Sequence, residues 1–119
     1  MESTRVDKPW GHEIIWARTD RYVGKILHIT AGKRLSYQYH RVKEETLRVE
    51  RGTLKLVYDE GDGVRETEMG PGAVFHVPPG TKHRMEAVTD VDVVEVSTPE
   101  LDDVVRLEDD YGREGTSAP

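Results

Sequence analysis

The stretch GKRLSYQYHRVKEETLRVERG, residues 32–52, decides the fold because it carries two short strand-like runs with polar groups among apolar ones. Side chains alternate between the two faces of a strand. Gln38 and His40 therefore lie on one face of the first run. Glu45 lies on the apolar face of the second run, whereas its neighbour Glu44 lies on the charged face. We expect Gln38, His40 and Glu45 to point into the interior together.

A fourth polar group of this kind is His83, which begins a later run in which Met85 and Ala87 share its face. Two imidazoles, one carboxylate and one amide form a donor set for a divalent ion, and a buried carboxylate without a partner would be costly. The chain has no cysteine, so thiolate ligands are excluded. The pattern predicts one divalent metal ion held by Gln38, His40, Glu45 and His83. Such mixed ligands suit zinc, manganese, iron, cobalt or nickel.

Short β-rich runs follow one another along the rest of the chain, with glycine and proline turns between them and no helix-length amphipathic pattern. The runs are 12–16, 22–29, 35–40, 46–51, 53–58, 74–77, 83–88 and 91–96. Many short strands with such turns are typical of an antiparallel sandwich or barrel. The 119 residues suffice for one compact domain. We therefore predict a single all-β domain over 1–119, ordered from about 8 to 113, with mobile termini.

Composition argues against several classes of partner. The net charge is −6, and neither a basic stripe nor an aromatic stacking pattern occurs, so nucleic-acid binding is not expected. No apolar run approaches membrane-spanning length, and the first residues lack an apolar leader, so a membrane partner and secretion are not expected. Together with the missing cysteines, this indicates a cytoplasmic protein that acts on a small molecule.

Two spaced motifs carry a family resemblance. Gly32-x5-Gln38-x-His40-x4-Glu45-x6-Gly52 resembles the first cupin motif, with glutamine where the first histidine usually stands. Gly72-x5-Pro78-x-Gly80-x2-His83 resembles the second cupin motif. The resemblance implies a double-stranded β-helix, that is, a jelly-roll barrel that binds a metal and is often a homodimer.

A closer resemblance extends over most of the chain. Lys8-Pro-Trp-Gly11, Lys33-Arg-Leu-Ser36 and the closing segment 102–113 are similar to the isomerase domain of type II mannose-6-phosphate isomerases. That family implies a Gln, His, Glu, His ligand set around zinc or a similar metal, which favours zinc here. Its isomerase domain commonly follows a guanylyltransferase domain that has no counterpart in these 119 residues, so we expect a stand-alone domain.

The same resemblance implies roles for residues outside the ligand set. The family's functional arginine and glutamate in the closing motif correspond to Arg106 and Glu108, so the resemblance implies that these two are the catalytic residues and that Glu108 lies near the proton transfer. Lys8, Arg34 and Lys25 are candidates for binding the substrate. The alternatives stay open: all three can be solvated surface charges, and Arg106 and Glu108 can form an ion pair that secures the carboxyl-terminal segment. His12, His28 and His76 fit no ligand pattern, and we expect structural roles for them.

Three hypotheses for function follow. The first is aldose-ketose isomerisation of a phosphorylated sugar such as mannose 6-phosphate. The second is an iron-dependent oxygenase, since two histidines and a carboxylate also suit ferrous iron. The third is a non-catalytic sugar-binding module, because a fold alone does not fix an activity.

Overall fold

The computed structural model describes residues 2–116, and this part of the chain consists of strands, turns and loops. The strands are β1 Thr4–Lys8, β2 Gly11–Arg18, β3 Val23–Ile29, β4 Tyr37–Tyr39, β5 Glu45–Arg51, β6 Leu54–Asp59, β7 Val64–Met69, β8 Val74–Val77, β9 Lys82–Ala87, β10 Val91–Ser97, β11 Val105–Glu108 and β12 Gly115–Thr116. Within the described residues, no helix is long and apolar enough to cross a membrane.

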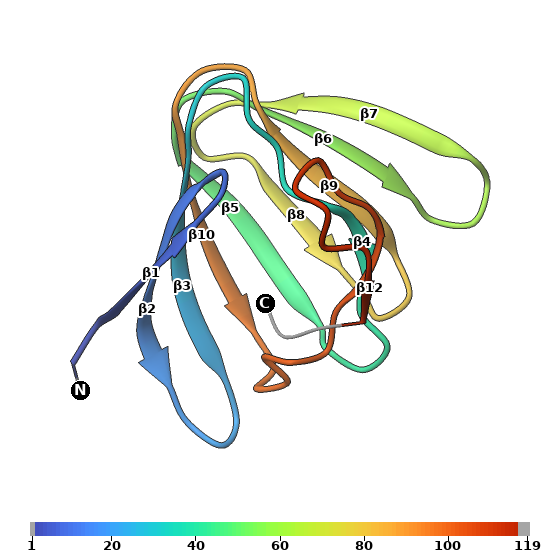
Figure 1. Cartoon of the computed structure of the whole chain (residues 1–119). Helices are drawn as coiled ribbons and strands as arrows, with labels where there is room; N and C mark the ends of the chain where they lie inside the picture. The colour runs from blue at the N-terminus through green and yellow to red at the C-terminus, as the bar shows by residue number, and fades with distance from the viewer. Residues whose placement is uncertain (1, 117–119) are drawn as a thin grey trace.

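The strands form two antiparallel sheets that face each other (Figure 1). The first sheet has the order β1-β2-β3-β10-β5-β8, and the second has the order β12-β11-β4-β9-β6-β7. β10 pairs with both β3 and β5 although it comes from the far end of the chain. Connections that repeatedly cross between two sheets are typical of a jelly-roll barrel. The predicted all-β, double-stranded β-helix fold is therefore confirmed.

All eight predicted runs are strands, whereas β1, β7, β11 and β12 were not predicted. β7 was missed because its sequence, Val-Arg-Glu-Thr-Glu-Met, is largely charged and exposed, so it lacks the apolar alternation that marks a strand. It forms by pairing along its whole length with β6. β12 and all of β1 except Lys8 lie outside the predicted ordered core, and these strands pair with β11 and β2. Residues 1 and 117–119 of the predicted mobile termini lie outside the described residues.

The interior between the sheets is apolar over part of its length and polar over the rest. Apolar side chains such as Leu47, Val49 and Leu56 are fully buried and form one continuous core. Charged and polar side chains are buried beside this core: Glu13, Lys25, His40, Lys43, Glu45, His83, Glu95 and Arg106. Charged side chains are seldom buried unless they have partners, so the polar end of the interior is a candidate functional site.

Gly52 in the hairpin between β5 and β6 provides a test of the fold. Its φ is 85°, and a Cβ built on it would lie 2.0 Å from the backbone oxygen of Asp90. We expect Gly52→Ala to lower the free energy of unfolding by about 2 to 4 kcal/mol, from left-handed strain and the backbone clash. Gly70→Ala is the matched control, because a Cβ there meets nothing within 4 Å. Urea denaturation measures both variants, and equal stability of the two would contradict this account.

Candidate metal centre

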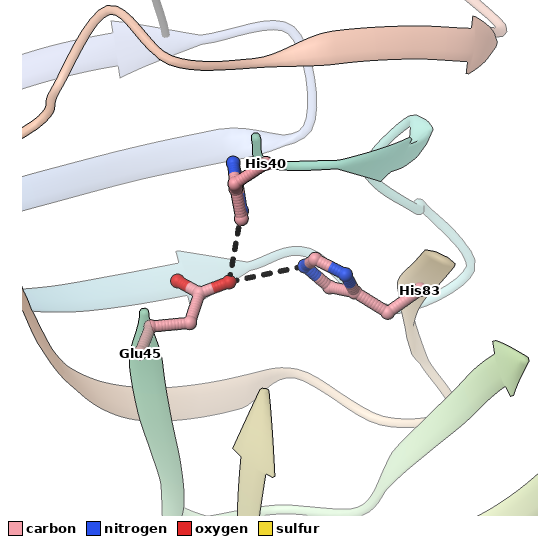
Figure 2. Close-up of side chains that lie close together, drawn as sticks. All are labelled: His40, Glu45 and His83. Atoms are coloured by element: carbon pink, nitrogen blue, oxygen red, sulfur yellow. Dashed lines mark hydrogen bonds and ion pairs between the residues drawn. The ribbon is translucent and has the colours of Figure 1, made fainter. Parts of the chain in front are cut away.

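Three separate strand ends bring His40, Glu45 and His83 together. His40 directly follows β4, Glu45 begins β5, and His83 is the second residue of β9. Figure 2 shows both imidazoles directed at one carboxylate oxygen of Glu45. Glu45 is buried and Glu44 is exposed, as the alternation of side chains along the strand predicted.

His40, Glu45 and His83, the metal group, have side chains that lie close enough to share one ion. The Nε2 atoms of His40 and His83 each lie 3.0 Å from Oε1 of Glu45. One ligand atom from each of the three residues lies within 4.8 Å of the other two. The side chains are 1%, 2% and 1% exposed for His40, Glu45 and His83. A buried His, Glu, His group of this size is suited to a divalent cation.

The hydrogen bonds of the imidazoles orient them for metal binding. Nδ1 of His40 lies 2.6 Å from the carbonyl oxygen of Asp103, and Nδ1 of His83 lies 2.9 Å from that of Thr81. A carbonyl only accepts, so each Nδ1 carries the proton, and a neutral ring then presents the lone pair of Nε2 to Glu45. Nε2 of His83 and Oε2 of Glu45 are buried without a hydrogen-bond partner. Converging electron-rich atoms need a cation, so the donor set fits a metal ion.

Gln38, the fourth predicted ligand, lies beside this group on β4. It stands opposite His83 in the strand register, and its Oε1 accepts a hydrogen bond of 2.6 Å from Oγ of Ser36. Gln38 also lines the interior cavity together with His40. An amide oxygen has two lone pairs, so it can accept a hydrogen bond from a hydroxyl group with one and bind a metal ion with the other. Its role as a ligand stays a prediction.

A buried lysine next to the metal group was missed by the sequence reasoning. Nζ of Lys43 lies 3.5 Å from Oε2 of Glu45 and 3.3 Å from Oε2 of Glu95. Burial raises the pKa of a carboxyl group, but the pKa of Glu45 lies well below its usual range, and the positive charge of Lys43 is the largest effect that opposes burial. Burial lowers the pKa of Lys43, but the two carboxylates outweigh burial and raise it. Both groups therefore stay charged at neutral pH.

Glu95 behaves in the opposite way to Glu45. Burial and the neighbouring charge of Glu45 raise its pKa, and Lys43 and Lys25 only partly offset this. A signal for Glu95 was present in the sequence, because the period of two places it on the same face of β10 as the buried Val91 and Val93. Lys43 lies in the loop before β5, where side chains do not alternate regularly, so the sequence pattern gave no basis for predicting its burial.

A cavity of about 40 Å³ lies beside the metal group, and three of the predicted catalytic and substrate-binding residues line it. They are Lys8, Lys25 and Arg106, which share the walls with Trp10, Glu13, Glu95 and Arg113, among others. Lys25 is buried and its Nζ lies 3.4 Å from Oε1 of Glu13. Burial, then repulsion from Arg113, lowers the pKa of Arg106. Lys25 is therefore not a solvated surface charge, which was its alternative role, and Lys8 is half-buried.

Arg34 and Glu108 do not line this cavity. Both border a groove on the outer face of the second sheet, where Arg34 forms ion pairs with Glu86 and Asp110. Strand alternation alone would put Glu108 on the same face as Arg106, two residues before it. The register of β11 shifts between these residues, so Arg106 pairs with Gln38 and Glu108 pairs with Tyr37. Such a bulge reverses the facing of the side chain, so Glu108 borders the outer groove while Arg106 lines the cavity. The catalytic role that the family resemblance implies for Glu108 stays a prediction.

The other histidines lie outside the metal group and have partners of their own. Nδ1 of His28 lies 2.7 Å from Oδ1 of Asp92, and the His28 ring stacks on the ring of His12. His76 is exposed, and its Nε2 lies 2.6 Å from Oε2 of Glu44. These contacts agree with the structural roles expected for the three histidines.

A two-sheet β-barrel that gathers two histidines and a glutamate on its inner side belongs to the class of barrels whose interior residues could hold a metal ion. The chain belongs to the cupin family: the family model described as "Cupin domain" matches residues 25–98, a segment that contains His40, Glu45 and His83.

Curated relatives extend the similarity beyond this segment. The chain is 35% identical over 113 residues to "Mannose-1-phosphate guanylyltransferase" of Escherichia coli (strain K12) and 32% identical over 113 residues to "Mannose-1-phosphate guanylyltransferase ManC" of Salmonella typhimurium. Each match covers 91% of this chain and 23% of the relative. The chain thus spans about a quarter of the length of these relatives.

Solved structures share the fold at low sequence identity. KdgF from Halomonas sp. has a TM-score of 0.71 and 21% identity, with 83% of this chain and 88% of that chain covered. The capsular polysaccharide assembling protein CapF from Staphylococcus aureus has a TM-score of 0.74 and 20% identity, covering 91% and 33%. Oxalate decarboxylase from Bacillus subtilis has a TM-score of 0.76 and 12% identity, covering 89% and 30%. These likenesses show the fold alone.

Removal of single ligands tests the metal centre. We expect His83→Ala to weaken zinc binding by about 100-fold or more and Gln38→Ala to weaken it less, because imidazole is the stronger donor for such ions. His76→Ala is the control, since that exposed histidine is outside the group. Competition with a zinc-binding dye gives the affinities. Equal zinc retention by the His83 and Gln38 variants would contradict the ranking.

Removal of Lys43 tests the buried charges. Lys43→Met leaves the carboxylates of Glu45 and Glu95 buried without their shared cation, so we expect a loss of about 3 to 5 kcal/mol in the free energy of unfolding of the metal-free protein. The double variant Lys43→Met, Glu95→Gln should recover part of this loss. Lys82→Met is the control because Lys82 is exposed on β9. Urea denaturation at neutral pH provides the measurement, and no recovery in the double variant would count against the electrostatic explanation.

Proposed function

We propose that this cupin domain is a metal-dependent aldose-ketose isomerase that acts on a phosphorylated sugar such as mannose 6-phosphate. The observation that carries the proposal is the buried His40, Glu45, His83 group at a cavity whose walls hold several cations. The likeness to two mannose-1-phosphate guanylyltransferases supports it, because the isomerase domain that this sequence resembles commonly follows a guanylyltransferase domain. Zinc is the favoured metal, and a homodimer in the cytoplasm is part of the same proposal.

The metal group supplies the electrostatic part of such a reaction. A divalent ion held by His40, Glu45 and His83, with Gln38 as a further ligand, would polarise the carbonyl of an open-chain sugar and stabilise the negative charge that develops on its oxygen atoms. With one carboxylate ligand, the site would keep a net positive charge of about one. Lys43 contributes a second fixed positive charge directly beside Glu45.

Isomerisation also requires a group that takes a proton from one carbon of the sugar and returns it to the adjacent carbon. Glu108 was the family-indicated candidate, but it faces the outer groove. Glu13 and Glu95 are the carboxylates that line the cavity. Either can accept the proton when ionised, and we propose that the proton transfer uses a carboxylate of this wall in place of Glu108.

One observation favours a second candidate function. Two histidines and one carboxylate form the facial set that ferrous iron uses in oxygenases, and His40, His83 and Glu45 match that composition. Gln38 as a fourth ligand would occupy a position that an oxygenase leaves open. A sugar-binding module without activity is the third candidate, since the same cavity can bind a ligand without converting it.

One experiment separates these functions. The full chain is loaded with zinc, its metal content is measured, and mannose 6-phosphate and other hexose and pentose phosphates are offered as substrates. We expect conversion of an aldose phosphate to its ketose, and loss of at least 100-fold of that activity in His83→Ala. Iron-dependent oxygen uptake would support the oxygenase. Binding of a sugar phosphate by the metal-loaded protein without turnover would contradict the isomerase and support the binding module.

A further inference from the structure

Residues 40–44 form the loop between β4 and β5. Two of the three residues of the metal group belong to this loop or adjoin it, because His40 begins it and Glu45 directly follows it. Backbone N–H groups that are not paired in a sheet need acceptors from elsewhere in the molecule. The contacts that hold this loop therefore decide where His40 and Glu45 point.

The carboxylate of Asp103 binds three successive N–H groups of this loop. Its Oδ1 accepts a hydrogen bond of 3.0 Å from the backbone nitrogen of Arg41, and its Oδ2 accepts hydrogen bonds from those of Val42 at 2.6 Å and Lys43 at 2.8 Å. The carbonyl oxygen of Asp103 also accepts the hydrogen bond from Nδ1 of His40. A single residue thus holds both the backbone of the loop and the imidazole of a metal ligand.

These contacts come from a segment far along the chain. Asp103 lies between β10 and β11, 62 positions after Arg41 and outside the segment 25–98 that the cupin family matches. Thr98 in the same connection holds the other end of the loop. Its Oγ1 accepts a hydrogen bond of 3.0 Å from the backbone nitrogen of Glu44, and its own nitrogen donates one of 3.0 Å to the carbonyl oxygen of Glu44.

Holding the loop matters because the ligand atoms converge. The Nε2 atoms of His40 and His83 both lie 3.0 Å from Oε1 of Glu45 (Figure 2). Lone pairs that face one another repel without a cation between them, so other contacts must keep these side chains in place. Hydrogen bonds from N–H groups to a carboxylate are roughly twice as strong as those between neutral groups. A site that is already ordered also loses less freedom when its ligand binds.

We propose that Asp103 is a positioning residue of the metal centre. Its carboxylate holds residues 41–43, and through them His40 and Glu45, in the geometry that receives a divalent ion. Contacts behind metal ligands change metal affinity by about 10- to 100-fold. The role concerns metal binding and not the reaction, so it applies equally to an isomerase, an oxygenase and a binding module.

The zinc affinity of the full chain, freed of metal by a chelator, tests this role. Asp103→Asn keeps the carbonyl that binds His40 but replaces one acceptor oxygen with an NH2 donor, so zinc should bind about 10-fold more weakly. Asp103→Ala removes all three side-chain contacts and should weaken zinc binding by about 100-fold. Asp102→Asn is the matched control, because it removes the same charge from the exposed neighbouring residue and should keep the parent's affinity. Competition with a zinc-binding dye measures all four proteins.

A second control separates positioning from a general loss of stability. Gly52→Ala destabilises the hairpin between β5 and β6 without touching an acceptor of the loop, so it should bind zinc as the parent does. Nitrogen-15 NMR of the imidazoles gives an independent measurement. The metal-free parent and Gly52→Ala should show the single form of His40 that carries its proton on Nδ1, and the Asp103 variants should show a mixture of the two tautomers.

The outcomes distinguish this role from the proposed function. Weaker zinc binding by Asp103→Asn than by Asp102→Asn supports the positioning role even if no sugar phosphate is converted, a result that contradicts only the isomerase. Zinc affinity equal to the parent's in Asp103→Asn, with an unchanged circular dichroism spectrum, overturns the role even if the zinc-loaded parent is an active isomerase. If Asp103→Ala does not fold, the comparison of the two Asn variants decides. Failure of the parent to bind zinc overturns the metal centre and this role with it.

Discussion

The structure depends on keeping the carboxylate of Glu45 ionised inside the barrel. An isolated buried carboxylate would take up a proton or unfold its surroundings, because charge is poorly solvated away from water. Lys43 and the imidazoles of His40 and His83 surround this carboxylate, and the backbone carbonyls of Asp103 and Thr81 fix the two rings. The polar end of the barrel is thus arranged to hold a negative charge that a divalent ion can use, and the metal proposal follows from that arrangement.

The buried charges alternate in sign across the inner face of the first sheet. The order runs from Glu13 on β2 to Lys25 on β3, then to Glu95 on β10, Lys43 and finally Glu45 on β5. Each ion has a neighbour of opposite sign, so each offsets part of the desolvation cost of the next. Each charge in this row is also the ion-pair partner or the paired-strand neighbour of the next. A substitution at Lys43 therefore affects the metal group and the cavity wall together.

Strand alternation predicted much of this arrangement from sequence. It identified eight of the strands and it chose Glu45 over Glu44, because both judgements depend only on the period of two along a paired strand. It gave no basis for the burial of Lys43, which lies in a loop that has no period. Glu108 was chosen from the family resemblance, and the register shift in β11 puts it at the outer groove, away from the cavity that Arg106 lines. Contacts between distant loops and bulges are set by tertiary packing, which one sequence does not reveal.

The two halves of the site come from different parts of the chain. The segment matched by the cupin family, residues 25–98, supplies His40, Glu45 and His83. The flanking segments add residues to the cavity wall, with Lys8, Trp10 and Glu13 before the matched segment and Val104, Arg106 and Arg113 after it. A metal group can serve many reactions, so the residues that face it decide which ligand is bound. Because the curated mannose-1-phosphate guanylyltransferases align with 91% of this chain, their likeness reaches beyond the family segment into at least part of these flanks. That extension carries more weight for the choice of substrate than the shared fold does.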